Sequence, residues 1–179
     1  MKKMNRRAFL TLTGAALAMM ALTACGADDA PAAPAAPTNG KEAKVLEAIN
    51  KYRGELPALT LDSGLDPTME IVVKLAKGEM EFDENAANAL GAAYANYNGL
   101  CAPIGVRTDN DDEDMNVTPV CVYSDNAELM AQNLNNQLDE SAKANLKSPA
   151  IKLVNIKTFE YSGTTYWVAL IAESKKVTT

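Results

Sequence analysis

Cysteine is the residue type with the most distinctive chemistry in this chain, because the 179 residues include three cysteines and no histidine. Without histidine, a Ser–His–Asp triad or a Cys–His pair lacks its base. A zinc site of the usual kind would have only Cys101 and Cys121 as ligands. We therefore expect no metal site and no cofactor, and any catalysis would have to use carboxylates.

The third cysteine, Cys25, follows a segment with the pattern of a secretory signal. Four basic residues lie within the first seven positions, and an apolar run over 8–24 ends in small residues. The sequence Leu22-Thr23-Ala24-Cys25 resembles the lipobox of bacterial lipoproteins. This resemblance implies that residues 1–24 are removed by cleavage between Ala24 and Cys25. It also implies that Cys25 then carries lipid on its thiol and its new amine.

Other interpretations of the N-terminal segment stay open. It could be an ordinary signal peptide with an incidental cysteine. A spanning helix is less favoured, because the uncharged run has 17 residues, at the lower limit of about 17–25 for crossing a bilayer, and no basic flank follows it. Asn5–Leu10 resembles a twin-arginine export signal, although Asn5 and Thr11 depart from the usual residues. The export route is therefore left open between the general secretory and twin-arginine systems.

Residues 25–40 separate the signal from the rest of the chain. Gly26–Gly40 is rich in alanine and proline, a composition that builds no core and favours an extended, flexible segment. At about 3.3 Å per residue it spans at most roughly 50 Å. We interpret it as a tether behind a lipid anchor, and residues 41–179 as one domain with its own core.

The charge of the mature chain limits its partners. Four of the 17 basic residues lie in the signal, which leaves 13 against 23 acidic residues and a net charge of −10. This balance argues against nucleic acid and against direct binding of anionic lipid headgroups. We expect membrane attachment through covalent lipid alone, which needs more than one acyl chain. The expected location is the outer face of the cytoplasmic membrane, or the outer membrane if the host has one.

The pattern of apolar residues predicts helices followed by strands. Helical spacing occurs at 43–52, 67–76, 85–97, from 124 or 125 to 137, and at 139–146. Strands are predicted at 102–107 and 118–123, and most clearly at 150–161 and 164–172. The turn Ser162-Gly163 joins the last two strands, and 164–172 is apolar on both faces, as in a central strand. The predicted fold class is α+β, with helices layered on a mainly antiparallel sheet.

Several segments follow one another in the order of motifs found in a single protein family. They are Val45–Asn50 with Tyr52–Gly54, Leu56–Asp62 with Leu65, Ser141–Leu146, and Lys152–Gly163 with Tyr166–Val168. Together they resemble the CAP superfamily, also called the SCP or cysteine-rich secretory, antigen 5 and pathogenesis-related 1 family. The resemblance covers both ends of the domain but not 78–116. It implies a CAP-like α-β-α sandwich with a C-terminal β-hairpin, and a role in binding lipid or cell-wall material.

The chain departs from this family where the family has its cavity. That cavity typically holds two histidines and two acidic residues, and the histidine position matched here is Ala142. The metal site and any catalytic role are therefore not carried over. Asn50, Tyr94 and Asn145 are candidates to line a cleft together with Ala142. Each of them could equally satisfy a buried backbone group.

Cys101 and Cys121 form an even pair in an exported domain, which favours a disulfide. Closing a loop of about 20 residues would contribute roughly 3 kcal/mol. Two free, buried thiols are the alternative.

Two acidic clusters could do chemistry but have simpler explanations. Asp109–Asp114 resembles a calcium loop in its alternating carboxylates, yet Val120 occupies the twelfth position, where a glutamate belongs, and the sixth position is not glycine. We therefore favour a solvated loop. The second cluster could supply a carboxylate pair for acid–base chemistry, or only charge at a helix start. Its members are Glu79, Glu81, Asp83 and Glu84.

These observations favour a cell-surface lipoprotein whose domain is a non-enzymatic binding or interaction module. Its ligand would be a small apolar molecule or a cell-wall component. The rival hypotheses are a hydrolase that acts on cell-wall material through carboxylates, and a purely structural surface domain. The oligomeric state is left open.

Overall fold

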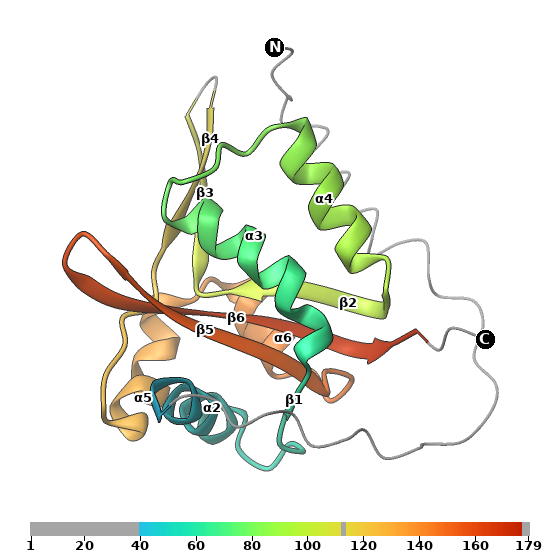
Figure 1. The fold of residues 1–179 in the computed structure, drawn as a ribbon. Helices are drawn as coiled ribbons and strands as arrows, with labels where there is room; N and C mark the ends of the chain where they lie inside the picture. Colours follow the sequence, from blue (N-terminus) through green and yellow to red (C-terminus); the bar gives the residue numbers. More distant parts are fainter. Residues whose placement is uncertain (1–39, 112–113, 177–179) are drawn as a thin grey trace.

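The computed structural model describes residues 40–111 and 114–176, and there a four-stranded sheet lies between two layers of helices (Figure 1). Helices α3 (Asp66–Ala76) and α4 (Glu84–Tyr94) cover one face of the sheet. Helices α2 (Gly40–Arg53), α5 (Ala127–Gln137) and α6 (Glu140–Leu146) cover the other. The predicted fold class, α+β with helices on a mainly antiparallel sheet, is confirmed.

The sheet has the order β1–β5–β6–β2. Strand β1 (Thr60–Leu61) runs parallel to β5 (Leu153–Tyr161), whereas β6 (Thr164–Lys175) is antiparallel to both β5 and β2 (Tyr97–Ile104). The two-residue turn Ser162-Gly163 has positive φ at both positions and pairs Tyr161 with Thr164. The predicted hairpin and the central position of its second strand are confirmed.

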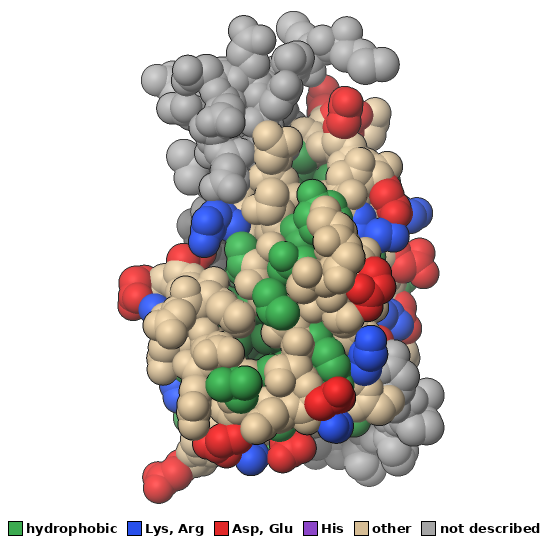
Figure 2. All heavy atoms as spheres, turned by 90° about the vertical axis from the view of Figure 1, so that its left-hand side faces the viewer, with side chains coloured by type: hydrophobic (Ala, Val, Ile, Leu, Met, Phe, Trp, Pro, Cys, Tyr) green, Lys and Arg blue, Asp and Glu red, His purple; other side chains and the backbone are tan. Residues whose placement is uncertain are grey.

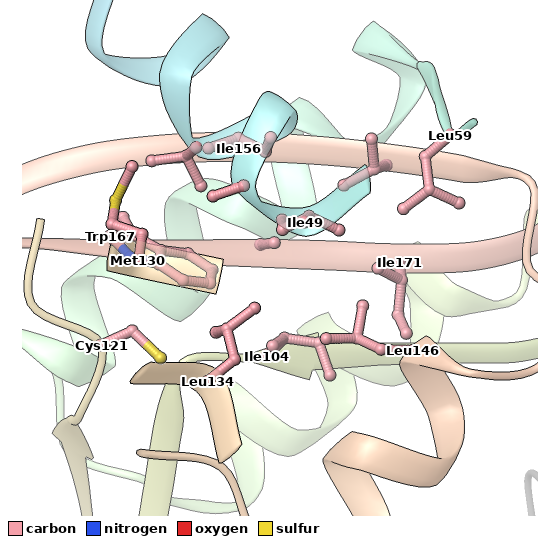
Figure 3. Close-up of a cluster of buried hydrophobic side chains, with 14 of the residues drawn as sticks. Ile49, Leu59, Ile104, Cys121, Met130, Leu134, Leu146, Ile156, Trp167 and Ile171 are labelled. Atoms are coloured by element: carbon pink, nitrogen blue, oxygen red, sulfur yellow. The ribbon is translucent and has the colours of Figure 1, made fainter. Parts of the chain in front are cut away.

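Alternate residues of β6 enter two separate hydrophobic cores, because successive side chains of a strand point to opposite faces. Val168, Leu170 and Ala172 pack under α3 and α4. Trp167, Ala169 and Ile171 pack against α2, α5 and α6. Figure 3 shows the core between the sheet and helices α2, α5 and α6, with labelled residues from these three helices around Trp167 and Ile171. All six of these β6 residues are fully buried, so β6 is the spine of both cores.

A second, two-stranded sheet interrupts the edge next to β6. It consists of β3 (Val106–Asp111) and β4 (Asp114–Pro119). The chain leaves β6 after β2 and returns to it through Cys121 and Tyr123. The Trp167 N–H donates to the Cys121 carbonyl (3.0 Å), and the Tyr123 N–H donates to the Thr165 carbonyl (2.9 Å). The two ends of the β3–β4 hairpin meet where the Val120 N–H donates to the Gly105 carbonyl (2.9 Å).

Gly105 is required where the hairpin branches off. Its φ is +89°, and a Cβ there would lie 2.7 Å from the Trp167 carbonyl oxygen. We expect Gly105→Ala to lower the free energy of unfolding by about 3 kcal/mol, from left-handed strain and a clash with backbone that cannot move away. Gly163→Ala is the matched control, since Gly163 has φ +77° but no atom within 4 Å of a Cβ. Urea unfolding measures both, and equal losses would contradict the role of close packing at Gly105.

The boundaries of several elements differ from those predicted. The helix predicted at 85–97 ends at Tyr94, because Tyr97 is already the first residue of β2. Most of the acidic segment predicted as a loop belongs to β3 and β4, while side chains over 109–115 lie outside the described part. Helix α5 is capped by Asn126, whose Oδ1 accepts from the Leu129 N–H (3.1 Å), and not by Ser124 or Asp125.

The N-terminal predictions fall on residues that the structure does not describe. Residues 1–39 include the signal, Ala24, Cys25 and nearly all of the tether. Lipidation at Cys25 therefore stays a prediction. Within the described part, no helix combines the length and hydropathy needed to cross a bilayer.

Candidate binding surface

The four residues predicted to line a cleft do not come together. Asn50 belongs to α2, and Ala142 and Asn145 belong to α6, whereas Tyr94 lies in α4 on the opposite face of the sheet. The Asn50 Oδ1 accepts from the Leu59 N–H (3.0 Å) and so satisfies a backbone group. Ala142 packs against the core under α2, α5 and α6. The predicted cleft is therefore wrong as a single site, since the sheet separates its members.

Tyr94 also has the environment of a packing residue. It is partly buried against the core under α3 and α4. Burial, with a smaller contribution from the Cys101 thiol, raises the pKa of Tyr94 above its ordinary value of 10. A tyrosine with a raised pKa stays neutral at physiological pH and is a poor general base.

Arg53 contacts backbone carbonyls from three separate parts of the chain. Its residue surface is only 2% exposed. Nη1 donates to the carbonyls of Leu146 (2.5 Å) and Ser148 (3.4 Å), and Nη2 donates to those of Pro57 (3.1 Å) and Ile151 (3.2 Å). Burial lowers the pKa of Arg53. This arginine joins the end of α2 to the end of α6 and to the segments leading into β1 and β5.

Cys101 and Cys121 are both free, which corrects the predicted disulfide. Cys101 is the β2 partner of Ala172 on β6, and its side chain packs on the α3–α4 side of the sheet. The backbone carbonyl of Cys121 accepts from the Trp167 N–H, and the Cys121 side chain lies in the core on the other side. Ala172 and Trp167 are five positions apart on β6, which corresponds to roughly 16 Å. A disulfide needs Cα atoms within about 7 Å, so the two thiols cannot meet.

Both thiols should be unreactive in the folded protein. Burial raises the pKa of Cys101 and of Cys121 to about 12, so at pH 8 both thiols are almost entirely protonated and the reactive thiolate is rare. We expect N-ethylmaleimide to modify neither cysteine in the native protein within minutes, and both in urea without reductant. Mass spectrometry of peptides measures this. Failure to modify both in urea until a reductant is added would restore the disulfide.

Two members of the acidic cluster over 79–84 have structural roles. The Asp83 side chain caps α4 by accepting from the Ala86 N–H (2.8 Å). Glu79 forms an ion pair with Lys77. No group of three His, Cys, Asp or Glu side chains in the described part is placed to hold a metal ion.

A shallow pocket of about 500 Å³ lies beside the first turn of α2. Its lining includes Lys44, Tyr123 and Asp125. The Lys44 Nζ donates to the Asp125 carbonyl (2.9 Å), and the Tyr123 hydroxyl donates to the Asp125 Oδ1 (2.7 Å). The Tyr123 hydrogen bond and then Lys44 lower the pKa of Asp125. These polar groups already form hydrogen bonds with one another, and the contacts attach α2 to the segment that follows β4.

The strongest candidate for a binding surface is a row of side chains at the free end of the β5–β6 hairpin. We call Val122, Phe159, Tyr161 and Tyr166 the aromatic row. Tyr166 pairs with Phe159 on one side and bridges to Val122 on the other. The rings of Phe159 and Tyr166 are stacked with centroids 6.5 Å apart, and the rings of Tyr161 and Tyr166 meet edge-on at 6.1 Å. The row therefore crosses three adjacent segments on the α3–α4 face.

The aromatic row is incompletely covered. Val122 is 41% exposed, and the three aromatic residues are half-buried. Phe159 contacts the core under α3 and α4, but Tyr161 and Tyr166 contact neither core. Figure 2 views the side of the molecule at which the hairpin tip lies, and shows hydrophobic side chains in an interrupted band with most charged side chains at its margins.

Most of the aromatic row has a signal in the sequence, although none of its residues is among the predicted cleft residues. The two-residue turn Ser162-Gly163 fixes the register of the hairpin, so Phe159 must face Tyr166. Alternation along β5 then places Tyr161 on the same face as Phe159. Only Val122 had no signal, because its pairing depends on how the β3–β4 hairpin is inserted.

Comparisons of the chain with protein-family models, with curated proteins and with solved structures found no match.

Proposed function

We propose that the protein is a lipid-anchored cell-surface protein whose domain is a non-enzymatic binding module. The observation that carries the proposal is the aromatic row at one end of the domain. Stacked rings with free faces bind apolar molecules and the apolar faces of polar ones, while tyrosine hydroxyls add hydrogen bonds. Neither the Tyr161 nor the Tyr166 hydroxyl has a hydrogen-bond partner among the described residues. A small apolar ligand or a cell-wall component fits this chemistry.

The described chain enters the domain at the end where the row lies. The described chain begins at Gly40, the first residue of α2, whereas the row lies on the α3–α4 face. Lys41 follows Gly40, and its Nζ lies 3.9 Å from the Glu160 carboxylate of β5. A tether that joins at Gly40 would therefore hold the row close to its own attachment point. The relation to the CAP superfamily stays a further proposal, supported by the matching segments at both ends of the domain and by the α-β-α layers.

The binding proposal is tested with the full chain purified from membranes of its native host. Mass spectrometry identifies molecules that co-purify with the wild type, with the double variant Tyr161→Ala/Tyr166→Ala, and with the control Tyr52→Ala. Tyr52 is also a half-buried tyrosine, but it lies on α2 beside Lys147. We expect one class of molecule to co-purify with the wild type and the control, and to fall at least tenfold with the double variant.

Two outcomes would overturn the proposal. One is that nothing is enriched over a chain-free control. The other is that the double variant retains the ligand as well as the wild type does. Release of fragments from cell-wall material by the wild type would instead favour the hydrolase hypothesis.

A further inference from the structure

Most of β5 has an unpaired outer edge. On that side its only partner among the described residues is β1, which pairs with Leu153 and Val154 and then ends. Beyond Val154 no strand in the described part of the chain lies against this outer side of β5. Edge strands with free N–H and C=O groups are templates for pairing with another chain.

The backbone groups that point outward can be identified. The Val154 carbonyl accepts from the Asp62 N–H (2.9 Å) and so points away from β6. In an antiparallel ladder the direction alternates with every residue. Ile156, Thr158 and Glu160 therefore also point their N–H and C=O groups outward, and no described residue bonds to them. Ile156 is only 2% exposed, which leaves Thr158 and Glu160 as the accessible positions.

The aromatic row stops at this same edge. Phe159 lies between Thr158 and Glu160, and its inner neighbour in the sheet is Tyr166. On the outer side Phe159 has no neighbour in the described part of the sheet. A strand that paired here would have to bring a side chain to cover that side of the ring.

We infer that a second copy of this chain occupies the edge, by antiparallel pairing of β5 with β5 across a two-fold axis at Phe159. Thr158 of each copy then exchanges backbone hydrogen bonds with Glu160 of the other, about four bonds in total. Phe159 faces Phe159 of the second copy as a close, non-hydrogen-bonded pair, the arrangement in which aromatic side chains interact best. Each half of the interface is the same patch, as a two-fold contact requires.

The charges fit this register and exclude a neighbouring one. With the axis at Phe159, Lys157 faces Tyr161 of the second copy, and Glu160 faces Thr158. No like charges are opposite one another. A shift of two residues that places the axis at Lys157 would set the two lysines directly opposite, which is destabilising, and would require Ile156 to be accessible.

The dimer would have two consequences. The aromatic rows of both copies would join into one continuous row across the axis. Because the axis is perpendicular to the sheet, the α2, α5 and α6 layers of both copies lie on the same side, and both tethers leave from that side. Only the second consequence rests on the proposed membrane anchor.

The first test uses full-length copies with two different tags, co-expressed and recovered through one tag. We expect wild-type copies to co-purify. Thr158→Glu places carboxylates opposite Glu160 of the second copy, and should lower recovery at least tenfold. The double variant Thr158→Glu/Glu160→Lys should restore it, because each new glutamate then faces a lysine. No co-purification of wild-type copies, or equal recovery of wild type and Thr158→Glu, would overturn the inference.

A second test does not depend on charge. In a non-hydrogen-bonded pair the Cα atoms lie about 4.5 Å apart, within the range for a disulfide. We expect Phe159→Cys to form disulfide-linked dimers under mild oxidation in membranes. Ser162→Cys is the control, because it is more exposed but would lie roughly 20 Å from its counterpart in the dimer. Equal cross-linking of both, or none at Phe159→Cys, would exclude this interface, whatever the outcome of the ligand experiment.

Discussion

Arg53→Met is expected to lower the free energy of unfolding by about 4 kcal/mol. The methionine keeps most of the apolar stem but removes four hydrogen bonds to carbonyls. The carbonyls of Leu146 and Ile151 belong to residues that are almost fully buried, so water cannot replace the lost donors without opening the structure. Since domains of this size are stable by only about 5–15 kcal/mol, the variant should unfold at far lower urea concentrations.

Lys51→Met on the same helix is the matched control. Lys51 is about half-exposed and forms ion pairs with Glu47 and Glu128. Solvent and salt screen pairs at such exposed positions, so they contribute little to stability. Urea unfolding followed by circular dichroism compares the two variants. A similar loss for both would mean that Arg53 is no more important than a surface cation.

Cys25→Ala is expected to abolish lipid attachment and release the chain from membranes. Each buried methylene of an acyl chain contributes about 0.8 kcal/mol, so several chains anchor the protein firmly and their loss is decisive. The described domain has an acidic surface with no spanning helix to replace them. The measurement is the fraction of protein that sediments with membranes after an alkaline wash.

Cys101→Ala serves as the control, because Cys101 is a half-buried core thiol and should leave fractionation unchanged. The intact mass of the wild type gives an independent readout. It should exceed the mass of residues 25–179 by the mass of the attached lipid. An unmodified Cys25, or a Cys25→Ala chain that is processed normally and stays in the membrane, would refute lipidation.

The sequence predicted the helices and the C-terminal hairpin because each has a strong local pattern. Asp66 and Pro67 mark the start of α3, and Ser162-Gly163 leaves the hairpin no other register. The β3–β4 hairpin escaped prediction because its acidic residues have low strand propensity. Strands β3 and β4 pair only with each other, and their sequences do not alternate between apolar and polar residues, so no strand pattern is visible there.

Less of the candidate site than of the fold could be predicted from the sequence. Asn50 stood out through a family resemblance, but its side chain satisfies a backbone group. The prediction of a disulfide was wrong because the spacing of two cysteines in the sequence does not show on which face of the sheet each side chain lies. Tyr161 and Tyr166 follow from alternation and turn length, although only the packing of the folded chain shows that the helices leave them uncovered.

The hydrogen bond between Val120 and Gly105 makes the β3–β4 hairpin a side branch of the chain. At the base of this branch, β2 and the segment at Cys121 are both hydrogen-bonded to β6. Residues between β3 and β4 could therefore be added or removed without changing the pairing of β6. Such a branch point is a place where related chains can diverge in length and charge while keeping both cores. The acidic charge carried by this segment of the sequence can therefore change independently of the rest of the domain.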